Sequence, residues 1–369
     1  MDGGTSNIMS WAMNNPRILI VRKGHVGGGI ERASSLMANF FASRDQDVVM
    51  LSLYDGKYSY KLDKRIRCVD VEVKSKYRVL RILNTIRLLR KEIIKIKPKV
   101  ILSYGEYMNT PVAIATRGLG VAVILSDRLS PNFSLGKVYN LLKKYSYSYV
   151  DGFIAQTEIS KQILLEKVKM KNVTVIPNPV NTIERVTCEK KNYIVTVGRL
   201  SPEKGQRYLL EAFAKLENHD WKLSIVGGYK RQERYDELVT LAKELGISDR
   251  VLFHGRRGDF SKELSEAQIF VLPSLLEGYP NALIEAMSLP LPCISSNCVA
   301  GPSDIIQHGV NGLLVESGNV QKLYEAMDLL TRDAKLREKL AEEAYKIRNK
   351  LSMNVIGQKY LDYVLSFVK

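Results

Sequence analysis

"RILIVRKGHVGGGIER", residues 17–32, decides the fold class of this chain. The short apolar run that begins it is typical of a buried strand, and the three consecutive glycines lead into a helical pattern. Similar apolar runs recur at 47–53, 99–104 and 121–127, and helical segments such as 77–97 separate them. Strands that alternate with helices indicate a parallel sheet with helices on both faces.

A second series of the same kind follows the Pro-Asn-Pro segment at 177–179. A chain of 369 residues suits about two domains. We therefore predict an α/β protein of two Rossmann-like, doubly wound domains, residues 1–180 and 181–352, which face each other across a cleft. A final helix at 353–369 is expected to return to the first domain, and residues 1–15 are expected to form a disordered overhang.

Composition excludes several classes of protein. No run approaches the ~18 uncharged apolar residues that span a bilayer. The first fifteen residues contain no Lys or Arg, unlike a secretory signal. The four cysteines (Cys68, Cys188, Cys293 and Cys298) have no metal-binding or redox spacing. We expect a cytoplasmic protein that carries no metal or other cofactor.

The positive charge is concentrated in the first half of the chain. Residues 1–180 contain 29 Lys and Arg against 14 Asp and Glu, whereas residues 181–369 contain 26 against 25. Much of the excess lies between residues 57 and 99. Such an imbalance indicates that the first half meets an anionic partner.

Two glycine-containing turns follow predicted strands. Glycines 27–29 let the backbone approach a ligand closely at the start of a helix, although an ordinary tight turn explains them equally well. "VGRLSPEKG", 197–205, places Arg199 and Lys204 five residues apart at the end of another strand. The two cations could bind a diphosphate, or they could be solvated surface residues.

"EGYPNALIEAM", 277–287, contains two glutamates eight residues apart. Glu285 has apolar neighbours, and a buried carboxylate without a partner is costly. A ribose diol bound over free N–H groups near 281–283 would satisfy it, with Pro280 near the first helical position. The alternative is that Glu285 pairs with a lysine elsewhere and that Glu277 stabilises a helix dipole.

Taken together, these motifs resemble the retaining glycosyltransferases of family 4 (glycosyltransferase group 1), which have the GT-B fold. "GGGIER" is similar to the family's GGAER loop, "VIPNPV" to its interdomain strand and "SIVGG" to its IVGDG segment. "VLFHGR" and "GPSDIIQHGVNGLLV" resemble two further family segments, and Glu-x7-Glu follows G-R-L-x-x-x-K by about 75 residues. The resemblance covers residues 17–350, and polysaccharide and lipid-linked-oligosaccharide N-acetylgalactosaminyl- or related hexosyltransferases are the members it resembles.

The resemblance implies metal-independent transfer of a hexose or N-acetylhexosamine from a nucleotide-sugar, with retention of configuration. UDP is favoured over GDP as the donor nucleotide. The implied acceptor is a hydroxyl of a polyprenyl-diphosphate-linked glycan in surface polysaccharide, lipopolysaccharide or O-antigen assembly; a soluble acceptor is the alternative. The implied catalytic residues are Arg199, Lys204, Glu277 and Arg128. The implied donor-binding residues are Gly28, Gly29, Gly198, Gly227, Tyr279, Pro280, Asn281, Ala282, Leu283 and Glu285.

Arg128 marks a departure from the family pattern. Many members have Ser-Glu-His after the fifth strand, whereas this chain has Ser126-Asp127-Arg128. Either Arg128 stabilises the phosphate or sugar in place of the histidine, or the acceptor side is arranged differently. His25, two residues before the glycines, could reach the cleft, although a lone histidine is more often structural.

Two basic segments, 74–99 and 137–150, interleave Lys and Arg with Leu, Ile and Tyr. We predict that they bind an anionic inner-membrane surface, which would make the enzyme peripheral on the cytoplasmic face. The alternative is that the apolar stripe belongs to the core and that the cations form a solvated face. A nucleic-acid-binding protein would also be basic, but no recognition motif is present and the glutamate pair would have no role.

Overall fold

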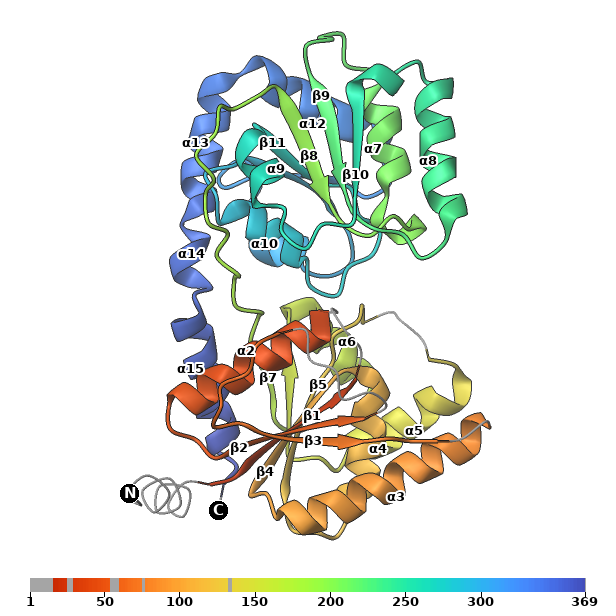
Figure 1. Cartoon of the computed structure of the whole chain (residues 1–369), viewed down its shortest axis with the longest axis vertical. Coiled ribbons are helices and arrows are strands. Elements are labelled where there is room, and N and C mark those ends of the chain that lie inside the picture. The colour runs from red at the N-terminus through yellow and green to blue at the C-terminus, as the bar shows by residue number, and fades with distance from the viewer. Residues whose placement is uncertain (1–15, 25–28, 54–59, 75–76, 132–134, 369) are drawn as a thin grey trace, which may run out of the picture. The chain divides into compact units, whose positions relative to one another are not determined.

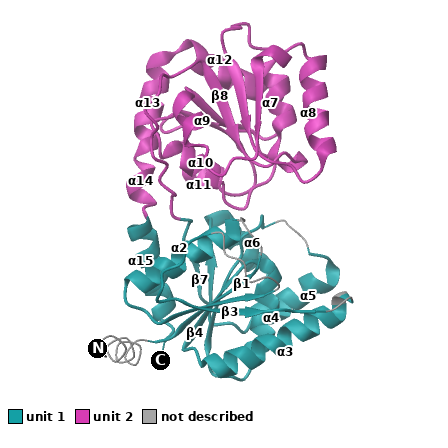
Figure 2. Ribbon diagram, in the orientation of Figure 1, with its two compact units in different colours: residues 1–178, 353–369 teal, residues 179–352 magenta. Residues whose placement is uncertain are grey.

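The computed structural model describes residues 16–24, 29–53, 60–74, 77–131 and 135–368. The chain divides into two compact units (Figure 2). Unit 1 comprises Met1–Asn178 and Met353–Lys369, and unit 2 comprises Pro179–Ser352. The division at Asn178 lies two residues before the boundary expected at residue 180. The overhang expected at residues 1–15 lies outside the described residues.

Unit 1 is built on a seven-stranded parallel sheet of order β3-β2-β1-β4-β5-β6-β7 (Figure 1). Its strands are β1 Ile18–Lys23, β2 Val48–Leu53, β3 Arg67–Val71, β4 Val100–Tyr104, β5 Ala122–Ser126, β6 Gly152–Ala155 and β7 Val173–Val175. Its helices are α2 Gly29–Ser43, α3 Arg78–Ile96, α4 Glu106–Thr116, α5 Lys137–Tyr147, α6 Glu158–Lys167 and α15 Met353–Leu365. Ile18, Leu19, Ile20 and Val21 are all 0% exposed, because helices cover both faces of a parallel sheet.

Unit 2 repeats the architecture with a six-stranded parallel sheet of order β10-β9-β8-β11-β12-β13. Its strands are β8 Tyr193–Val197, β9 Lys222–Val226, β10 Val251–Gly255, β11 Ile269–Leu272, β12 Cys293–Asn297 and β13 Leu313–Glu316. Its helices are η1 Pro202–Lys204, α7 Gln206–Phe213, α8 Gln232–Glu244, η2 Ser248–Arg250, α9 Ser261–Glu266, α10 Asn281–Met287, α11 Pro302–Ile305, α12 Val320–Arg332, α13 Ala334–Tyr345 and α14 Ile347–Lys350. Both units are therefore doubly wound, Rossmann-like domains.

The strand order determines where a ligand can bind in each unit. In an open parallel sheet, ligands bind outside the carboxyl ends of the two strands at which the order reverses. These strands are β1 and β4 in unit 1, and β8 and β11 in unit 2. The segments that leave these strands are therefore the ones to search for functional residues.

The last helix of the chain packs into unit 1, on α2. Gly357 of α15 lies against the ring of Phe40, so close that an added Cβ would come within 2.7 Å of that ring. Tyr363 also donates a hydrogen bond from its hydroxyl to the Asn172 carbonyl, at 2.8 Å. No helix among the described residues combines the length and apolarity that crossing a bilayer requires.

Glu106, the first residue of α4, holds the segment that leaves β5. The backbone N–H groups of Arg128 and Leu129 donate to its Oε1, at 2.8 and 2.7 Å. The residue is 5% exposed, and burial, reinforced by the neighbouring Asp127 carboxylate, raises the pKa of Glu106 from 4.5 to about 7. The nearby Lys143 acts in the opposite direction and lowers this pKa. Tyr139 donates a hydrogen bond to the backbone carbonyl of Glu106.

We expect Glu106 to make the stability of unit 1 depend on pH. Between pH 4.5 and about 7 the unfolded chain releases this proton while the folded chain keeps it, so the free energy of unfolding falls as pH rises. The loss is about 3 kcal/mol. Glu106→Gln can still accept hydrogen bonds from both N–H groups. Its free energy of unfolding, measured with urea, should therefore change less between pH 5 and 8 than that of the parent. The exposed Glu72→Gln is the control, and a Glu106→Gln profile parallel to the parent's would contradict the assignment.

Candidate active site

The carboxyl ends of β8 and β11 bring together two of the predicted catalytic residues. The Lys204 Nζ lies 2.6 Å from the Glu277 Oε1, and the Ser274 hydroxyl donates to the same oxygen at 2.7 Å. The Glu277 side chain is only 6% exposed, so the lysine offsets the cost of burying its charge. The pair fixes the position of the Lys204 ammonium group where the strand order of unit 2 reverses.

Backbone hydrogen bonds join the segment after β8 to the segment after β11. The carbonyl of Glu203 accepts the N–H groups of Leu275 and Leu276, at 2.9 and 3.3 Å. Gly205 has a φ of +67°, and a Cβ there would come within 2.0 Å of the Pro273 carbonyl oxygen. Only glycine allows this close approach, which places Lys204 beside β11.

Gly198 and Gly227 belong to the same construction. The Gly198 N–H donates to the Val226 carbonyl at 2.9 Å. A Cβ on Gly227 would come within 1.9 Å of the Gly198 carbonyl oxygen. Packing between the ends of β8 and β9 therefore already requires a glycine at 227, whatever ligand the site binds.

Arg199 is placed differently from Lys204, although the sequence pairs them. Its guanidinium contacts the Glu203 Oε1 at 2.8 Å, and its side chain is 49% exposed. Its carbonyl accepts a hydrogen bond from the Gln206 Nε2 at 3.0 Å, which fixes the backbone of the turn. The site thus has one partly buried cation held by a buried carboxylate, and a second cation at the solvent boundary.

The remaining predicted donor-binding residues of unit 2 lie at the start of α10. Tyr279 is 7% exposed, Pro280 precedes the helix, and Asn281, Ala282 and Leu283 are its first three residues. Glu285 is 4% exposed on the same helix.

The expectation of free N–H groups at 281–283 is wrong for two of the three. The Asn281 N–H donates to the Tyr279 carbonyl at 2.9 Å, and the Leu283 N–H donates to the Pro280 carbonyl at 3.0 Å. The chain turns tightly enough after Pro280 for local carbonyls to accept these donors. Side chains must therefore supply most of any ligand binding at this turn.

Two residues of this site were missed in the sequence. Ser274 lies two residues after the end of β11 and three residues before Glu277, and that spacing is the signal that could have identified it. Cys298 is 4% exposed, and burial, with a further contribution from Glu277, raises the pKa of its thiol to about 11 while Lys204 acts to lower it. No spacing in the sequence links Cys298 to the other residues of the site, so sequence alone could not have identified it.

In unit 1, Arg128 is held by the last helix. Its guanidinium donates to the Tyr360 hydroxyl at 2.9 Å and to the Asn178 Oδ1 at 2.5 Å, and it stacks 4.5 Å from the centre of the Tyr104 ring. Arg128 thus connects the end of β5 to α15 and to the last residue before unit 2. Its catalytic role stays a prediction.

The other predicted positions in unit 1 lie in or beside the glycine loop. Gly29 is the exposed first residue of α2, whereas Gly28 and His25 lie outside the described residues. Within the described part of the chain, no group of three or more His, Cys, Asp or Glu side chains is arranged to hold a metal ion.

Comparisons with known proteins identify the family of this chain. Residues 27–184 match the family described as Glycosyltransferase Family 4, and residues 182–347 match the family described as Glycosyl transferases group 1. An uncharacterized glycosyltransferase of Haemophilus influenzae is 30% identical over 324 residues, which cover 86% of this chain and 90% of that protein.

Two further proteins are similar over nearly their whole length. One is the Campylobacter jejuni GalNAc-alpha-(1->4)-GalNAc-alpha-(1->3)-diNAcBac-PP-undecaprenol alpha-1,4-N-acetyl-D-galactosaminyltransferase, which is 26% identical over 91% of this chain and 95% of that protein. The other is the crystal structure of a glycosyltransferase from Rickettsia africae, with a TM-score of 0.84, 20% identity, and coverage of 96% of this chain and 99% of that one. The chain therefore belongs to the group 1 glycosyltransferases of family 4, and its fold is GT-B.

Proposed function

We propose that this glycosyltransferase transfers a hexose or N-acetylhexosamine from a nucleotide-sugar, with UDP favoured, to a hydroxyl of a lipid-linked glycan. The transfer retains the anomeric configuration and uses no metal. The Campylobacter relative, whose name specifies an undecaprenol-diphosphate-linked acceptor, supports the choice of acceptor. GDP as the donor nucleotide and a soluble acceptor are the alternatives.

The Lys204–Glu277 pair carries this proposal. When the sugar leaves a nucleoside diphosphate, negative charge grows on the departing oxygen, and a preorganised cation lowers the barrier. Lys204 is such a cation, because Glu277 and the turn before Gly205 hold it at the end of β8. In this proposal the half-exposed Arg199 turns from Glu203 to the phosphates once they bind.

The two glutamates have separate roles in this proposal. Glu277 holds Lys204 and contacts hydroxyls of the donor sugar, and Glu285 accepts hydrogen bonds from the ribose. A glycosidase would instead need one carboxyl group as a proton donor and the other as a nucleophile or base. Hydrolysis of that kind has no use for a cation held 2.6 Å from one of the two carboxylates.

Nucleotide release in a screen of nucleotide-sugar donors, with a polyprenyl-diphosphate-linked glycan as acceptor, tests the proposal. Arg199→Ala and Lys204→Met should each lower kcat about 10²-fold or more and affect donor affinity less, because the charge they meet grows in the transition state. Lys204→Met should also destabilise unit 2, because it leaves Glu277 buried without its cation. Activity should persist in EDTA.

A second substitution separates catalysis from stability. Adding Glu277→Gln to Lys204→Met should recover part of the lost stability while turnover stays low, because the cation is still missing. Lys222→Ala, an exposed lysine of the same unit, is the control and should behave like the parent. Unchanged kcat with weakened binding in both cation variants would show that they only dock the donor.

Glu285→Ala should weaken nucleotide binding by about 1.5–3 kcal/mol, the usual worth of hydrogen bonds to a charged group. Calorimetric titration with the free nucleoside diphosphate measures this effect without the sugar. For the corresponding 2′-deoxy nucleotide, the difference in affinity between the parent and Glu285→Ala should be smaller than for the ribonucleotide. Equal affinity of parent and Glu285→Ala for the ribonucleotide would refute the ribose assignment.

The proposal also includes binding of the basic helices α3 and α5 to an anionic membrane surface, and their exposed side chains support it. On α3 the apolar stripe is divided: Leu89, Ile93 and Ile96 belong to the core, whereas Val79 and Leu80 are 69% and 51% exposed. On α5, Val138 and Leu141 are 75% and 70% exposed, and Tyr145 is 54% exposed. Exposed aliphatic side chains among cations suit a lipid surface, whereas nucleic acid would use aromatic stacking.

Val138→Ser with Leu141→Ser should reduce sedimentation with anionic liposomes about tenfold or more. Each side chain would contribute up to about 1.5–3 kcal/mol when fully buried, and neither supports the core. Val310→Ser with Leu329→Ser, at two exposed positions of unit 2, is the matched control. Binding should also fall as salt rises. Undiminished sedimentation of the α5 variant would remove the membrane from the proposal.

A further inference from the structure

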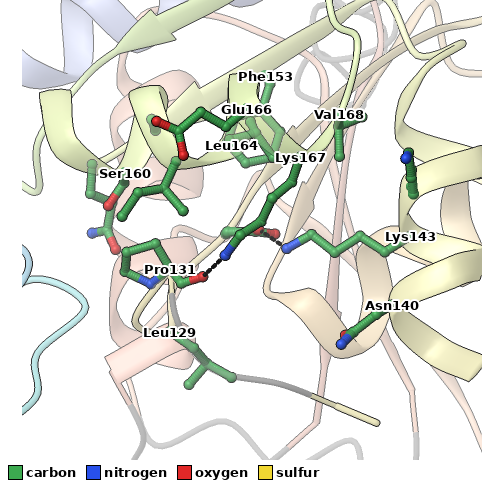
Figure 3. A pocket seen from close by; sticks show the side chains of 15 residues that line it. Leu129, Pro131, Asn140, Lys143, Phe153, Ser160, Leu164, Glu166, Lys167 and Val168 are labelled. Atoms are coloured by element: carbon green, nitrogen blue, oxygen red, sulfur yellow. Dashed lines mark hydrogen bonds and ion pairs between the residues drawn. The ribbon is translucent and has the colours of Figure 1, made fainter. Parts of the chain in front are cut away.

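Unit 1 contains a pocket of about 420 Å³ between α5 and α6 (Figure 3), and every residue that lines it belongs to unit 1. This volume falls in the range of small-molecule sites. The pocket opens beside the segment that leaves β5, on which Leu129 and Pro131 lie. Nothing in the donor chemistry requires it.

The inner wall of the pocket is apolar. Phe153 and Ala155 of β6 form its floor, and Leu164 with Ile163 lines it from α6. Phe153 and Leu164 are 2% and 7% exposed, so these side chains are fixed by the core behind them. The interior therefore suits a hydrocarbon chain.

Lysines supply the polar part of the same pocket. Lys143 and Lys144 come from α5 and Lys167 comes from the end of α6. Figure 3 shows the ammonium groups of Lys143 and Lys167 converging from opposite helices. Within the described parts of unit 1, the Lys167 Nζ donates to a neutral acceptor, the Pro131 carbonyl at 3.3 Å, and an anion would be a stronger partner.

The acidic groups of the pocket do not cancel this charge. Asp127 is already engaged by Lys143 at 2.5 Å, by the Tyr147 hydroxyl at 2.8 Å and by the Asn109 amide at 2.8 Å. The Glu166 carboxylate points away from the two converging ammonium groups (Figure 3). Lys144 and Lys167 are therefore the cations left to meet a ligand.

We propose that this pocket binds the acceptor lipid at the junction of its isoprenoid chain and its diphosphate. The chain lies over Phe153 and Leu164, and the diphosphate meets Lys144 and Lys167. The volume takes only the part of a long chain next to the phosphate. This inference rests on the proposed function, because it identifies a site for the lipid of that acceptor.

The position of α5 connects the pocket to the lipid surface. Val138 and Leu141, three residues apart, lie on the exposed face of α5. Asn140, Lys143 and Lys144 of the same helix line the pocket. A helix presents residues three and four apart on one face, so α5 carries both an outward apolar face and a pocket face. A lipid could pass from the bilayer to the pocket along this helix.

Calorimetric titration of the full-length protein with farnesyl diphosphate, without membranes and below micelle-forming concentrations, tests the proposal. Farnesyl diphosphate should bind at least tenfold more tightly than either farnesol or inorganic pyrophosphate. The double variant Lys144→Gln with Lys167→Gln should bind farnesyl diphosphate at least tenfold more weakly than the parent does. Its affinity for farnesol should be unchanged. Lys169→Gln with Lys171→Gln, two exposed lysines outside the pocket, is the charge-matched control.

A bulky side chain tests the apolar part independently. Ile163→Trp should abolish binding of both farnesyl diphosphate and farnesol, whereas Leu165→Trp, on the exposed side of the same helix, should not. Equal binding of pyrophosphate and farnesyl diphosphate would reduce the pocket to a simple anion site. Absence of farnesyl diphosphate binding, or tight binding that survives both pocket variants, would overturn the proposal.

Donor turnover in the same samples separates this inference from the proposed function. Release of nucleotide from a nucleotide-sugar with water as acceptor depends on Lys204 and not on the pocket. If that release persists while farnesyl diphosphate fails to bind, the pocket assignment is wrong and the proposed function stands. If farnesyl diphosphate binds but no nucleotide-sugar is turned over, the proposed function is wrong and the pocket stands.

Discussion

The contact between Lys204 and Glu277 is the interaction on which the site of unit 2 depends. The two residues lie 73 positions apart, and they meet because β8 and β11 are neighbours with parallel carboxyl ends. A carboxylate buried to 6% exposure is tolerated only with a partner, so the lysine is part of the fold as well as of the site. The close approach of Gly205 to the Pro273 carbonyl places Lys204 beside β11 and so allows this contact. The charge to which the proposed function assigns catalysis and the local stability of unit 2 are therefore linked in the same pair.

Unit 1 uses a carboxylate for a different purpose. Glu106 stands at the equivalent reversal of strand order and is hydrogen bonded to the backbone after β5. Arg128, one residue from Asp127 on that segment, is fixed in turn by Tyr360 from the end of the chain. The last helix thus contacts a segment that lies more than 220 residues earlier in the chain, and both belong to unit 1.

Some of the basic residues of the first half form ion pairs within unit 1, and others stay exposed to bind a ligand. Lys143, which looks like a surface lysine in the sequence, forms a mostly buried pair with Asp127 beside a hydrogen-bonded tyrosine. Lys144, the next residue, is exposed at the mouth of the α5–α6 pocket. On α3 the same division separates core leucines and isoleucines from exposed ones. Charge and apolar surface that remain exposed together suit an amphiphilic anion, and both proposals for unit 1 follow from that combination.

The sequence by itself determined the fold class, the two-unit organisation and the residues at the strand ends. It could do so because apolar runs, glycine turns and the Glu-x7-Glu spacing are local patterns whose chemistry depends on near neighbours. It did not reveal the half-exposed strand β3, the partners of Arg128, the burial of Lys143 or the pocket between α5 and α6. Each of these depends on contacts between distant segments: Arg128 and Tyr360 are 232 positions apart. Local sequence carries no record of such contacts, because packing of whole helices and strands decides which side chains meet and which stay exposed.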